Sequence, residues 1–467
     1  MKKHRWLSGI LQKSLGRRRS ARHSVPSARI ESLEARSLLT VQGISLADPA
    51  NLGDTANGES GIGGRSVSND GRYAVVLSHS PNLVQGQIDR AGVDAFLLDR
   101  QTGEISLVSH QAGSSVATAG SVIQAVISGN GQYVAFASSA TDLVTGQTDS
   151  NGDTDVFLYD RVTGSIVLVS HAVGSLTTAG NEGSGFDNLS LSADGRYVCY
   201  GSQATNLVSG QSDASGTIDA FVFDRTTGTS ALVSHASSSA TTAGDFGGSG
   251  AKISANGSVI GFTSSSTNLV SGLNDANGTN SDVFLYAVGS GTITLASRTA
   301  ASANTTGNAF SFFGDLSSDG QFVVFSSRAD NLVNGFVDAN DPNINFNQND
   351  DLYLFSGGAN VLVSHAAGLP TTGGNAETNY EPRISADGNW IVFGSNATNL
   401  ISGQNDQNGS IDLFLYNRAS QTSTLVSGAN GSATTTGNAF TGISTISNDG
   451  QKIAFQSSAF VADSGNL

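Results

Sequence analysis

The stretch SGNGQYVAFASSATDLVTGQTDSNGDTDVFLYDRVTGSIVLVS, residues 128–170, decides the fold of this chain. A Ser-x-[Asp/Asn]-Gly tetrapeptide at 128–131 is followed by the apolar runs YVAF at 133–136, DVFLYD at 155–160 and SIVLVS at 165–170. Asn-Gly or Asp-Gly between two apolar runs is a strong signal of a β-hairpin. The stretch therefore predicts short strands joined alternately by tight turns and longer loops.

The same pattern recurs along the chain with a spacing of about 62 residues. The tetrapeptide is found as SNDG at 68–71, SGNG at 128–131, SADG at 192–195, SANG at 254–257, SSDG at 317–320, SADG at 385–388 and SNDG at 447–450. An Asn-Leu-Val-x-Gly element comes next, as NLVQG at 82–86, DLVTG at 142–146, NLVSG at 206–210 and 268–272, NLVNG at 331–335 and NLISG at 399–403. An acidic loop and a third strand that opens with aspartate follow, so each unit has four strands.

Four short strands per repeated unit predict an all-β fold, the β-propeller, because one four-stranded sheet cannot bury both faces and must stack on its neighbours. Six units are full, and a seventh pair of strands lies at 443–457. VQGISLAD at 41–48 aligns with a fourth strand and is expected to complete the seventh blade. We predict one domain over 41–467 with about seven blades, the closing blade being incomplete and shared by both ends. Six blades, or a chain that stops before its last blade is finished, are the alternatives.

The repeats resemble those of the TolB-like, WD-like bacterial propellers, in which Ser-Pro-Asp-Gly-x-x-[Ile/Val]-Ala-Phe recurs once per blade. The resemblance covers residues from about 60 to 457, but the proline is absent from every tetrapeptide. It implies the fold, and it does not transfer the translocation role of TolB to this chain.

Residues 1–40 differ in composition from the rest, since they hold 10 of the 23 Lys and Arg residues and only two acidic ones. IESLEARSLLT at 30–40 resembles the Leu-Glu-Pro-Arg-x-Leu-Leu motif near the N-terminus of many bacterial surface and secreted proteins, with Ala35 in place of the proline. We therefore expect a targeting or sorting segment, disordered or removed, and an extracellular or cell-surface destination. A solvated basic tail is the alternative.

From residue 41 onward, 13 basic residues face 36 acidic ones. The negative charge of this part of the chain repels phosphate backbones and anionic lipid, which argues against nucleic acid and membrane surfaces as partners. No apolar run approaches the 18 residues of a membrane-spanning helix.

Cys199 is the single cysteine and lies in the apolar run YVCY at 197–200, where a core position is expected. We expect a monomer that binds an unknown protein or glycan.

The loops between second and third strands, and between fourth and first strands, are both about 15 residues long. In a blade whose strands follow one another outward, these two loops emerge on the same face, which we call the long-loop face. Long loops on a rigid scaffold are a common place for binding sites, so this face is the predicted functional surface.

Carboxylate and amide side chains alternate around a glycine in these loops, as in DSNGDTD at 149–155. Ca²⁺ prefers six to eight oxygen ligands on a tightly turned backbone, so the pattern predicts weak calcium sites, with a dissociation constant on the order of 10⁻⁴ M or poorer. The alternative is that Asp and Asn only form turns. The candidate ligands are Asp149, Asn151, Asp153, Asp155, Asp213, Asp219, Asp275, Asn277, Asp282, Asp338, Asn340, Asp351, Asp406, Asn408 and Asp412.

Departures from the repeat point to a second candidate site. Lys252, Asp315 and Arg383 occupy one repeated position in three consecutive units, with Glu381 nearby. They are expected near the central channel, either as an ion-pair chain between blades or as a polar ligand funnel. Histidines recur after the fourth strand, at His110, His171, His235 and His365. Equivalent positions on different blades cannot converge on one metal ion, so a solvated polar cap is expected there.

The sequence thus predicts a non-catalytic secreted or cell-surface propeller that binds or scaffolds through its long-loop face. The alternative is an enzyme of the cell envelope, for example a carbohydrate-active one, with its site in the funnel of Lys252, Asp315, Glu381 and Arg383. Such an enzyme is expected to show two carboxylates a few ångströms apart with perturbed pKa values.

Overall fold

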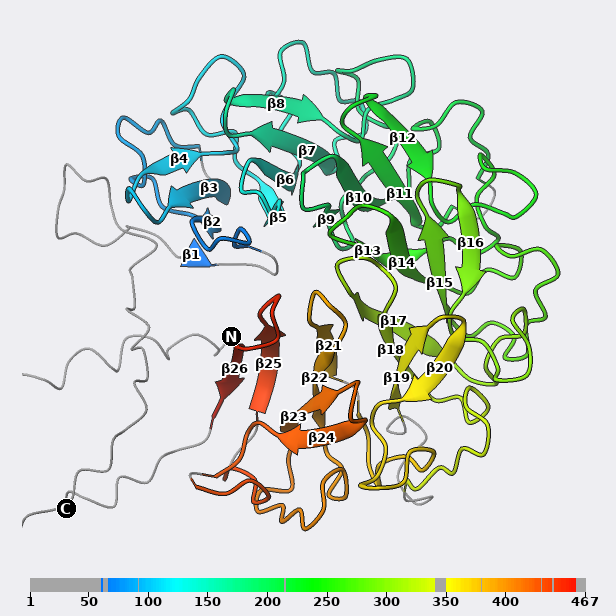
Figure 1. Cartoon of the computed structure of the whole chain (residues 1–467). Coiled ribbons are helices and arrows are strands. Elements are labelled where there is room, and N and C mark those ends of the chain that lie inside the picture. Colours follow the sequence, from blue (N-terminus) through cyan, green and yellow to red (C-terminus); the bar gives the residue numbers. More distant parts are fainter. Residues whose placement is uncertain are drawn as a thin grey trace, which may run out of the picture. The chain divides into compact units, whose positions relative to one another are not determined.

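The computed structural model describes residues 60–61, 66–90, 92–213, 216–340, 350–378, 380–429, 431–438 and 441–458. Within these ranges the chain forms 26 strands and no helix (Figure 1). The basic segment 1–40 and the strand expected at 41–48 lie outside the described residues.

The strands form six antiparallel sheets of four strands and one of two, each in chain order. The first strands are β1 (Ser60–Gly61), β5 (Val122–Ile127), β9 (Ser190–Leu191), β13 (Ser249–Ile253), β17 (Ser311–Leu316), β21 (Tyr380–Ile384) and β25 (Thr441–Ile446). The second strands are β2 (Tyr73–Ser78), β6 (Tyr133–Ser138), β10 (Tyr197–Ser202), β14 (Val259–Ser264), β18 (Val323–Ser327), β22 (Trp390–Ser395) and β26 (Ile453–Ser457).

The third strands are β3 (Asp94–Asp99), β7 (Asp155–Asp160), β11 (Asp219–Asp224), β15 (Asp282–Ala287), β19 (Asp351–Ser356) and β23 (Asp412–Asn417). The fourth strands are β4 (Ile105–Leu107), β8 (Ser165–Leu168), β12 (Thr229–Leu232), β16 (Thr292–Leu295), β20 (Ala359–Leu362) and β24 (Thr422–Leu425). Figure 1 shows the sheets following one another around a common centre, and consecutive sheets contact each other through pairs such as β2 with β5 and β10 with β13. This is the seven-bladed propeller that the repeats predict, rather than the six-bladed alternative.

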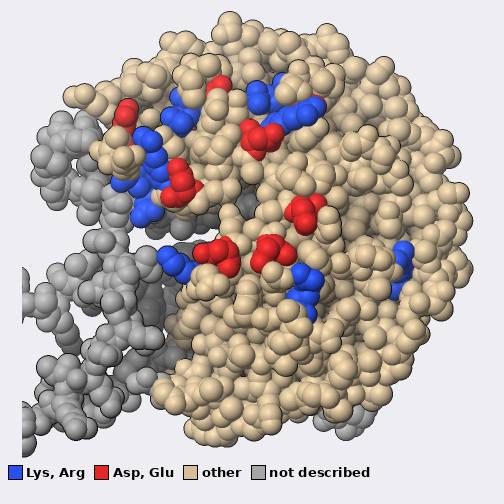
Figure 2. Space-filling model, in the orientation of Figure 1, with Lys and Arg blue, Asp and Glu red and all other residues tan. Residues whose placement is uncertain are grey.

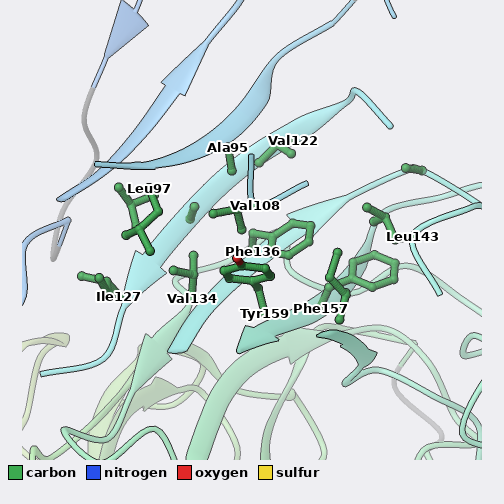
Figure 3. Close-up of a cluster of buried hydrophobic side chains, with 14 of the residues drawn as sticks. Ala95, Leu97, Val108, Val122, Ile127, Val134, Phe136, Leu143, Phe157 and Tyr159 are labelled. Atoms are coloured by element: carbon green, nitrogen blue, oxygen red, sulfur yellow. The ribbon is translucent and has the colours of Figure 1, made fainter. Parts of the chain in front are cut away.

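The core lies between the blades. One cluster joins Val75 and Leu97 of the first sheet to Val134, Phe136 and further residues of the second (Figure 3). Each blade covers the face of the next, so side chains of both sheets are removed from water. This is the stacking of four-stranded sheets that the repeats predict. Aromatic rings of the second and third strands stack within the second to sixth blades, for example Phe136 on Phe157 with centroids 5.5 Å apart.

Cys199 in β10 is fully buried, which confirms its predicted core position. Burial raises the pKa of its thiol far above the usual range. It is therefore a packing residue and not a reactive thiol.

The tetrapeptide forms the tight turn between the first and second strands. In the second blade, Ser128 Oγ donates to Asn130 Oδ1 at 2.7 Å and accepts from the N–H of Tyr133 at 2.9 Å. Gly131 has φ +70°, a conformation that favours glycine. This explains why serine, Asp or Asn, and glycine recur at these positions.

The same turns join neighbouring blades through backbone hydrogen bonds. In each of the six described junctions, an N–H of one tetrapeptide donates to a carbonyl of the next. The pairs are Asn69 to Gly129, Asn130 to Ala193, Ala193 to Ala255, Asn256 to Ser318, Ser318 to Ala386 and Ala386 to Asn448, at 2.7–3.0 Å. The short-turn face is thereby held by a continuous series of bonds.

Candidate functional site

The long loops of each blade are ordered by backbone pairing. In all six units a residue of the second-to-third loop forms a parallel bridge with a residue of the connection to the next blade. These bridges are Ile88–Ala117, Thr148–Thr178, Ser212–Thr242, Asn274–Thr305, Val337–Thr372 and Asn405–Thr435. The long-loop face is thus a built surface, as a preorganised binding site requires.

The Asn-Leu-Val-x-Gly element joins each blade to the one before it. The carbonyl of Asn206 accepts from the N–H of Val173 at 2.8 Å, and the Oδ1 of Asn206 accepts from the N–H of Asn181 at 3.0 Å. The carbonyls of Asp142, Asn268, Asn331 and Asn399 accept in the same way. The recurrence of this element therefore has a structural cause at the five junctions between the first and the sixth blades.

A glutamine after this element closes the loop, which the sequence analysis missed. Gln147 Oε1 accepts from the N–H groups of Leu143 and Val144, and its Nε2 donates to the carbonyl of Ala140 at 2.8 Å. Gln87, Gln211 and Gln404 repeat these contacts. Their recurrence directly after the glycine was the available signal.

The first aspartates of the acidic loops make turns. Asp149 Oδ1 accepts from the N–H groups of Asn151 and Gly152, at 3.0 and 3.1 Å. Asn151 Oδ1 accepts from the N–H of Asp153, and its Nδ2 donates to the carbonyl of Gly180. The loop at Asp406 and Asn408 repeats this arrangement, with Gly437 in the place of Gly180. Asp213 accepts from Gly216 at 3.4 Å.

The last aspartate of each loop is buried at the start of the third strand. Ser170 Oγ donates to Asp155 Oδ1 at 2.7 Å and accepts from the N–H of Val156. Burial raises the pKa of Asp155 to about 7, and the nearby charges of Asp149 and Asp153 act in the same direction. The equivalent serine bonds occur at Asp94, Asp219, Asp282, Asp351 and Asp412. One oxygen of each of these aspartates, five of which are candidate calcium ligands, is therefore already engaged.

The loop at 275–282 brings three candidate ligands together. Asn277 Nδ2 donates to Asp282 Oδ2 and to the carbonyl of Ala309, both at 3.1 Å, and Asp275 accepts from the N–H of Asn277. Asn277 Oδ1 is buried and, among the described residues, has no hydrogen-bond donor. An acceptor oxygen in this state fits a bound cation.

In the fifth blade the acidic loop is longer, and residues 341–349 lie outside the described residues. Asp338 accepts from the N–H of Asn340 at 2.9 Å, and burial raises the pKa of Asp351 to about 7. Asp350 pairs with Arg328 at 2.5 Å, an ion pair in which Asp350 is almost fully buried. Within the described part of the chain, no group of three or more His, Cys, Asp or Glu side chains has an arrangement that could hold a metal ion.

The residues proposed for the central funnel lie on consecutive innermost strands, and two of them, Lys252 and Asp315, bind across junctions. Lys252 Nζ on β13 donates to the carbonyl of Gly314 on β17 at 2.6 Å. Asp315 Oδ2 accepts from the N–H of Ile384 on β21 at 3.4 Å. Arg383 Nη1 lies 3.3 Å from the carbonyl of its neighbour Pro382. Glu381 also lies on β21, and its side chain is outside the described part.

The sequence analysis missed two further polar residues, Gln124 and Asp187, that form hydrogen bonds between neighbouring blades near the inner strands. Gln124 of the second blade donates to the carbonyls of Gly185 and Asp187 in the third blade. Asp187 in turn accepts from the N–H of Gly250 in the fourth. Together with Lys252, these contacts link neighbouring blades close to the centre.

The recurrent histidines are not a solvated cap, which corrects the prediction. His171, His235 and His365 are buried, and His110 is half-buried. The Nε2 of His171 lies 3.1 Å from the carbonyl of Gly228 in the next blade, and its ring stands edge-on to Phe223. The other three make equivalent contacts, with Gly164, Gly291 and Gln421. As predicted, they do not converge, because each one fastens a different junction.

Exposed apolar side chains gather in the long loops. Of the thirteen exposed large hydrophobic residues described, nine lie in these loops or at the second residue of a first strand. They are Ile88, Ile123, Val173, Leu176, Phe186, Phe246, Phe312, Val337 and Leu369. Figure 2 shows that, on the face in view, charges of both signs gather mainly around the centre and over one part of the ring, while most of the rest is uncharged.

Solved structures similar to this chain include TolB from Acinetobacter baumannii, at 14% identity and a TM-score of 0.33, over 71% of this chain and 58% of that one. An oligogalacturonate lyase from Vibrio parahaemolyticus is 10% identical over 85% and 87% of the two chains, with a TM-score of 0.45. Dipeptidyl peptidase 4 of Porphyromonas gingivalis is 11% identical over 82% and 47%, with a TM-score of 0.44. The chain thus spans less than two thirds of the length of TolB.

TolB, whose repeats the sequence resembles, is therefore among the similar structures. Similarities of this strength assign neither an activity nor a partner. No family model matches the chain, and no curated protein matches it in sequence. Among the residues that the structure describes, no helix has the length and hydropathy needed to cross a membrane.

Proposed function

We propose that this protein is a non-catalytic binding or scaffolding propeller of the bacterial cell surface or extracellular space. It engages a protein or glycan partner through its long-loop face. The observation that carries this proposal is the concentration of exposed apolar side chains in those loops. Large apolar side chains exposed on one face of a soluble protein are typical of an interaction site.

Three phenylalanines from consecutive blades are the largest side chains of the proposed contact surface. Phe186 and Phe246 lie near the ends of the connections before β9 and β13, Phe312 is the second residue of β17, and they are 46%, 50% and 45% exposed. Phe312 also contacts the ring of Phe310, with centroids 5.9 Å apart. Aromatic side chains supply large contact area at little entropic cost, and they are enriched at protein interfaces. The bonded loop framework reduces the ordering that a partner must impose.

The alternative of an envelope enzyme has weaker support. Lys252 and Asp315 each bond to the backbone of the next blade, as expected for residues that hold blades together. The carboxylates whose pKa burial raises to about 6 or 7, such as Asp155, Asp219 and Asp282, belong to separate blades and are bonded to serines. The geometry therefore favours binding over acid–base chemistry in the funnel.

Calcium is the second part of the proposal, and the loop of Asp275, Asn277 and Asp282 is the favoured site. The buried Oδ1 of Asn277, without a donor among the described residues, supports a cation at this position. Asp282 accepts from Asn277 Nδ2 and Ser297 Oγ, and Asp275 Oδ1 accepts from the N–H groups of Asn277 and Gly278. The lone pairs that these bonds leave on the two carboxylates, with backbone carbonyls, would complete a hard-cation shell. Bound Ca²⁺ would fix the loop and would offset part of the negative charge of the domain.

The segment at 30–40 supports the proposed location. Its resemblance to a surface-protein motif, together with the acidic body, fits an exported bacterial protein. Fractionation of cells that express the full chain should place it in the envelope or the medium. Recovery from the cytosol alone would contradict this location.

Binding is tested with the full chain and a triple variant, Phe186→Ser, Phe246→Ser and Phe312→Ser. The matched control replaces exposed apolar residues outside the face, with Val162→Ser, Val167→Ser and Phe455→Ser. The probes are an array of bacterial and plant polysaccharides and isolated cell envelopes. We expect the wild type and the control to bind equally and the triple variant to bind about tenfold more weakly or worse. Equal binding by both variants would overturn the proposal.

A further inference from the structure

A hollow of about 410 Å³ lies at the junction of the fourth and fifth blades. Residues 298–303 of the connection after β16, residues 332–334 of the Asn-Leu-Val-x-Gly element and residues 358–360 at the start of β20 line it. It is separate from the phenylalanines Phe186, Phe246 and Phe312 of the long-loop face. We call it the Arg298 hollow.

This junction differs from the others in two ways. At four other junctions a histidine contacts a carbonyl in the turn between the third and fourth strands of the next blade, as His171 contacts Gly228. Here Arg298 replaces the histidine, and the turn is shortened to Gly357 and Gly358, both with positive φ. The turn of the second blade, by comparison, has four residues, 161–164. The hollow thus coincides with a shorter turn and a changed residue.

Arg298 is the one described arginine whose guanidinium has no hydrogen-bond acceptor in the described part of the chain. Arg72, Arg90, Arg196 and Arg328 pair with aspartates. Arg100, Arg161, Arg225, Arg383 and Arg418 donate to backbone carbonyls. The guanidinium of Arg298 only lies over the ring of Phe355, 5.1 Å from its centroid.

Neighbouring residues fix the position of Arg298 but give its guanidinium no hydrogen-bond acceptor in the described part of the chain. Asn360 Nδ2 donates to the carbonyls of Ala296 and Arg298, at 3.1 and 3.0 Å, and so fixes the backbone of the arginine against the fifth blade. A Cβ on Gly358 would collide with Nη2 of Arg298, so the glycine makes room for the guanidinium. Five N–H donors are therefore preorganised beside a hollow, in a chain of net charge −15.

We propose that the Arg298 hollow binds a small carboxylate ligand of about the size of one sugar acid. A guanidinium binds a carboxylate through two parallel hydrogen bonds, and arginine stacked on an aromatic ring keeps its donors available for this. Thr299, Ser302 and Asn334 offer uncharged polar groups for hydroxyls or amides. The volume falls in the range typical of small-molecule sites. Both a uronic acid and the terminal carboxylate of a peptide present this chemistry.

The equivalent hollow between the first and second blades provides an internal contrast. It is lined by Gln111, Asp142 and Gln147 among others, and its charged residue is acidic. Both Arg90 and Gln111 donate to Asp142 Oδ2 at 2.7 Å. Because the carboxylate and the cation there already pair with each other, we expect that hollow to bind carboxylates more weakly than the Arg298 hollow does.

Saturation-transfer NMR on the full chain tests the proposal. The probes are glucuronate with glucose as its neutral analogue, and N-acetyl-dialanine with its amide. We expect at least one carboxylate to bind, its neutral analogue to bind about tenfold more weakly or worse, and Arg298→Gln to weaken carboxylate binding by a similar factor. Arg418→Gln is the control, because Arg418 also stacks on an aromatic ring but lies outside the hollow.

The two probe pairs distinguish the sources, since a preference for glucuronate indicates a sugar acid and a preference for N-acetyl-dialanine indicates a peptide terminus. Thermal midpoints of both variants establish that they are folded. Equal binding of charged and neutral probes, an unaffected Arg298→Gln variant, or no transfer from either carboxylate at tens of millimolar would each overturn the proposal. None of these outcomes bears on the phenylalanine surface of the long-loop face.

Discussion

The backbone N–H of Ala193 donates a 2.7 Å hydrogen bond to the carbonyl of Ala255 in the next blade. Ala193 is the second residue of its tetrapeptide, the position at which the TolB-like repeats carry proline. Proline has no N–H and would break this contact. Asn69, Ser318 and Ala386 donate from the same position. At these four positions the absence of proline is thus tied to how the blades are joined.

Ala193→Pro should destabilise the protein, although it restores the family residue. The loss of one backbone hydrogen bond between blades, with its acceptor left unpaired, costs about 1–3 kcal/mol. Ala255→Pro is the matched control, because in its tetrapeptide the neighbouring Asn256 donates instead. Urea unfolding followed by circular dichroism compares the two. A midpoint for Ala193→Pro equal to that of Ala255→Pro would contradict the explanation.

Ser170→Ala should destabilise the second blade by about 1–3 kcal/mol, because it removes the donor to buried Asp155 and the acceptor for the N–H of Val156. Exposed Ser115→Ala is the control and should change stability by less than about 0.5 kcal/mol. Chemical denaturation measures both. Indistinguishable variants would show that the Asp155–Ser170 contact contributes little.

Stability should fall as the pH rises from about 4 to 7. Burial raises the pKa of Asp155, Asp219 and Asp282 to about 7, above the value in an unfolded chain, so the folded protein binds more protons in this range. Each such group removes up to about 1.4 kcal/mol per pH unit. The pKa values of Asp99 and Asp224, lowered to about 2, act only below this window.

The measurement is the thermal midpoint at a series of pH values, for the wild type and for Asp155→Asn. Asparagine keeps an acceptor for Ser170 but does not titrate, so the slope should become shallower. A midpoint that rises with pH across this window would refute the sign of the effect.

Millimolar Ca²⁺ should raise the thermal midpoint relative to excess chelator. For a dissociation constant of about 10⁻⁴ M, 1 mM free Ca²⁺ stabilises by roughly 1.4 kcal/mol per site, or about 2 °C in a domain of this size. Asp275→Asn keeps the turn but removes a charged ligand and should lose this increment, whereas Asp319→Asn in a tetrapeptide should not. An equal response to Mg²⁺ would identify ionic strength as the cause.

His171→Ala should lower stability by about 1–3 kcal/mol, since it removes the contact with Gly228 and the ring packing on Phe223. Exposed His79→Ala provides the comparison. Hydrophobic dye binding at elevated temperature would report an opened junction. Equal thermal midpoints for the two alanine variants would count against a fastening role.

Strand positions and the seven-bladed architecture could be predicted because turn residues and apolar runs act locally, as in SGNG at 128–131 followed by YVAF at 133–136. The burial of Cys199 followed from the same alignment. Strand positions and core positions depend on residues within one repeat, and the same residues recur in every repeat.

Contacts between blades could not be predicted in this way. The sequence analysis expects His171 to be solvated, but the structure buries it. Its partner Gly228 lies 57 residues away in the next blade, so a single repeat does not show the contact. At the junction of the fourth and fifth blades, the sequence did show a shorter turn, Gly357–Gly358, and an arginine, Arg298, in the place of the recurrent histidine. Only the spatial arrangement shows that these two departures from the repeat meet. The candidate calcium ligands remain a prediction for the same reason, since their free oxygens depend on how each loop folds.

The bonds from Ala193 to Ala255 and from Val173 to Asn206 are made between blades rather than within one. Amide protons of this kind exchange with solvent only when two neighbours separate, so hydrogen exchange would report junctions and not single sheets. A lone blade leaves these donors and acceptors unpaired on both sides. The smallest cooperative unit of this protein is therefore a pair of adjacent blades, and local opening should spread from a weakened junction to its neighbours around the ring.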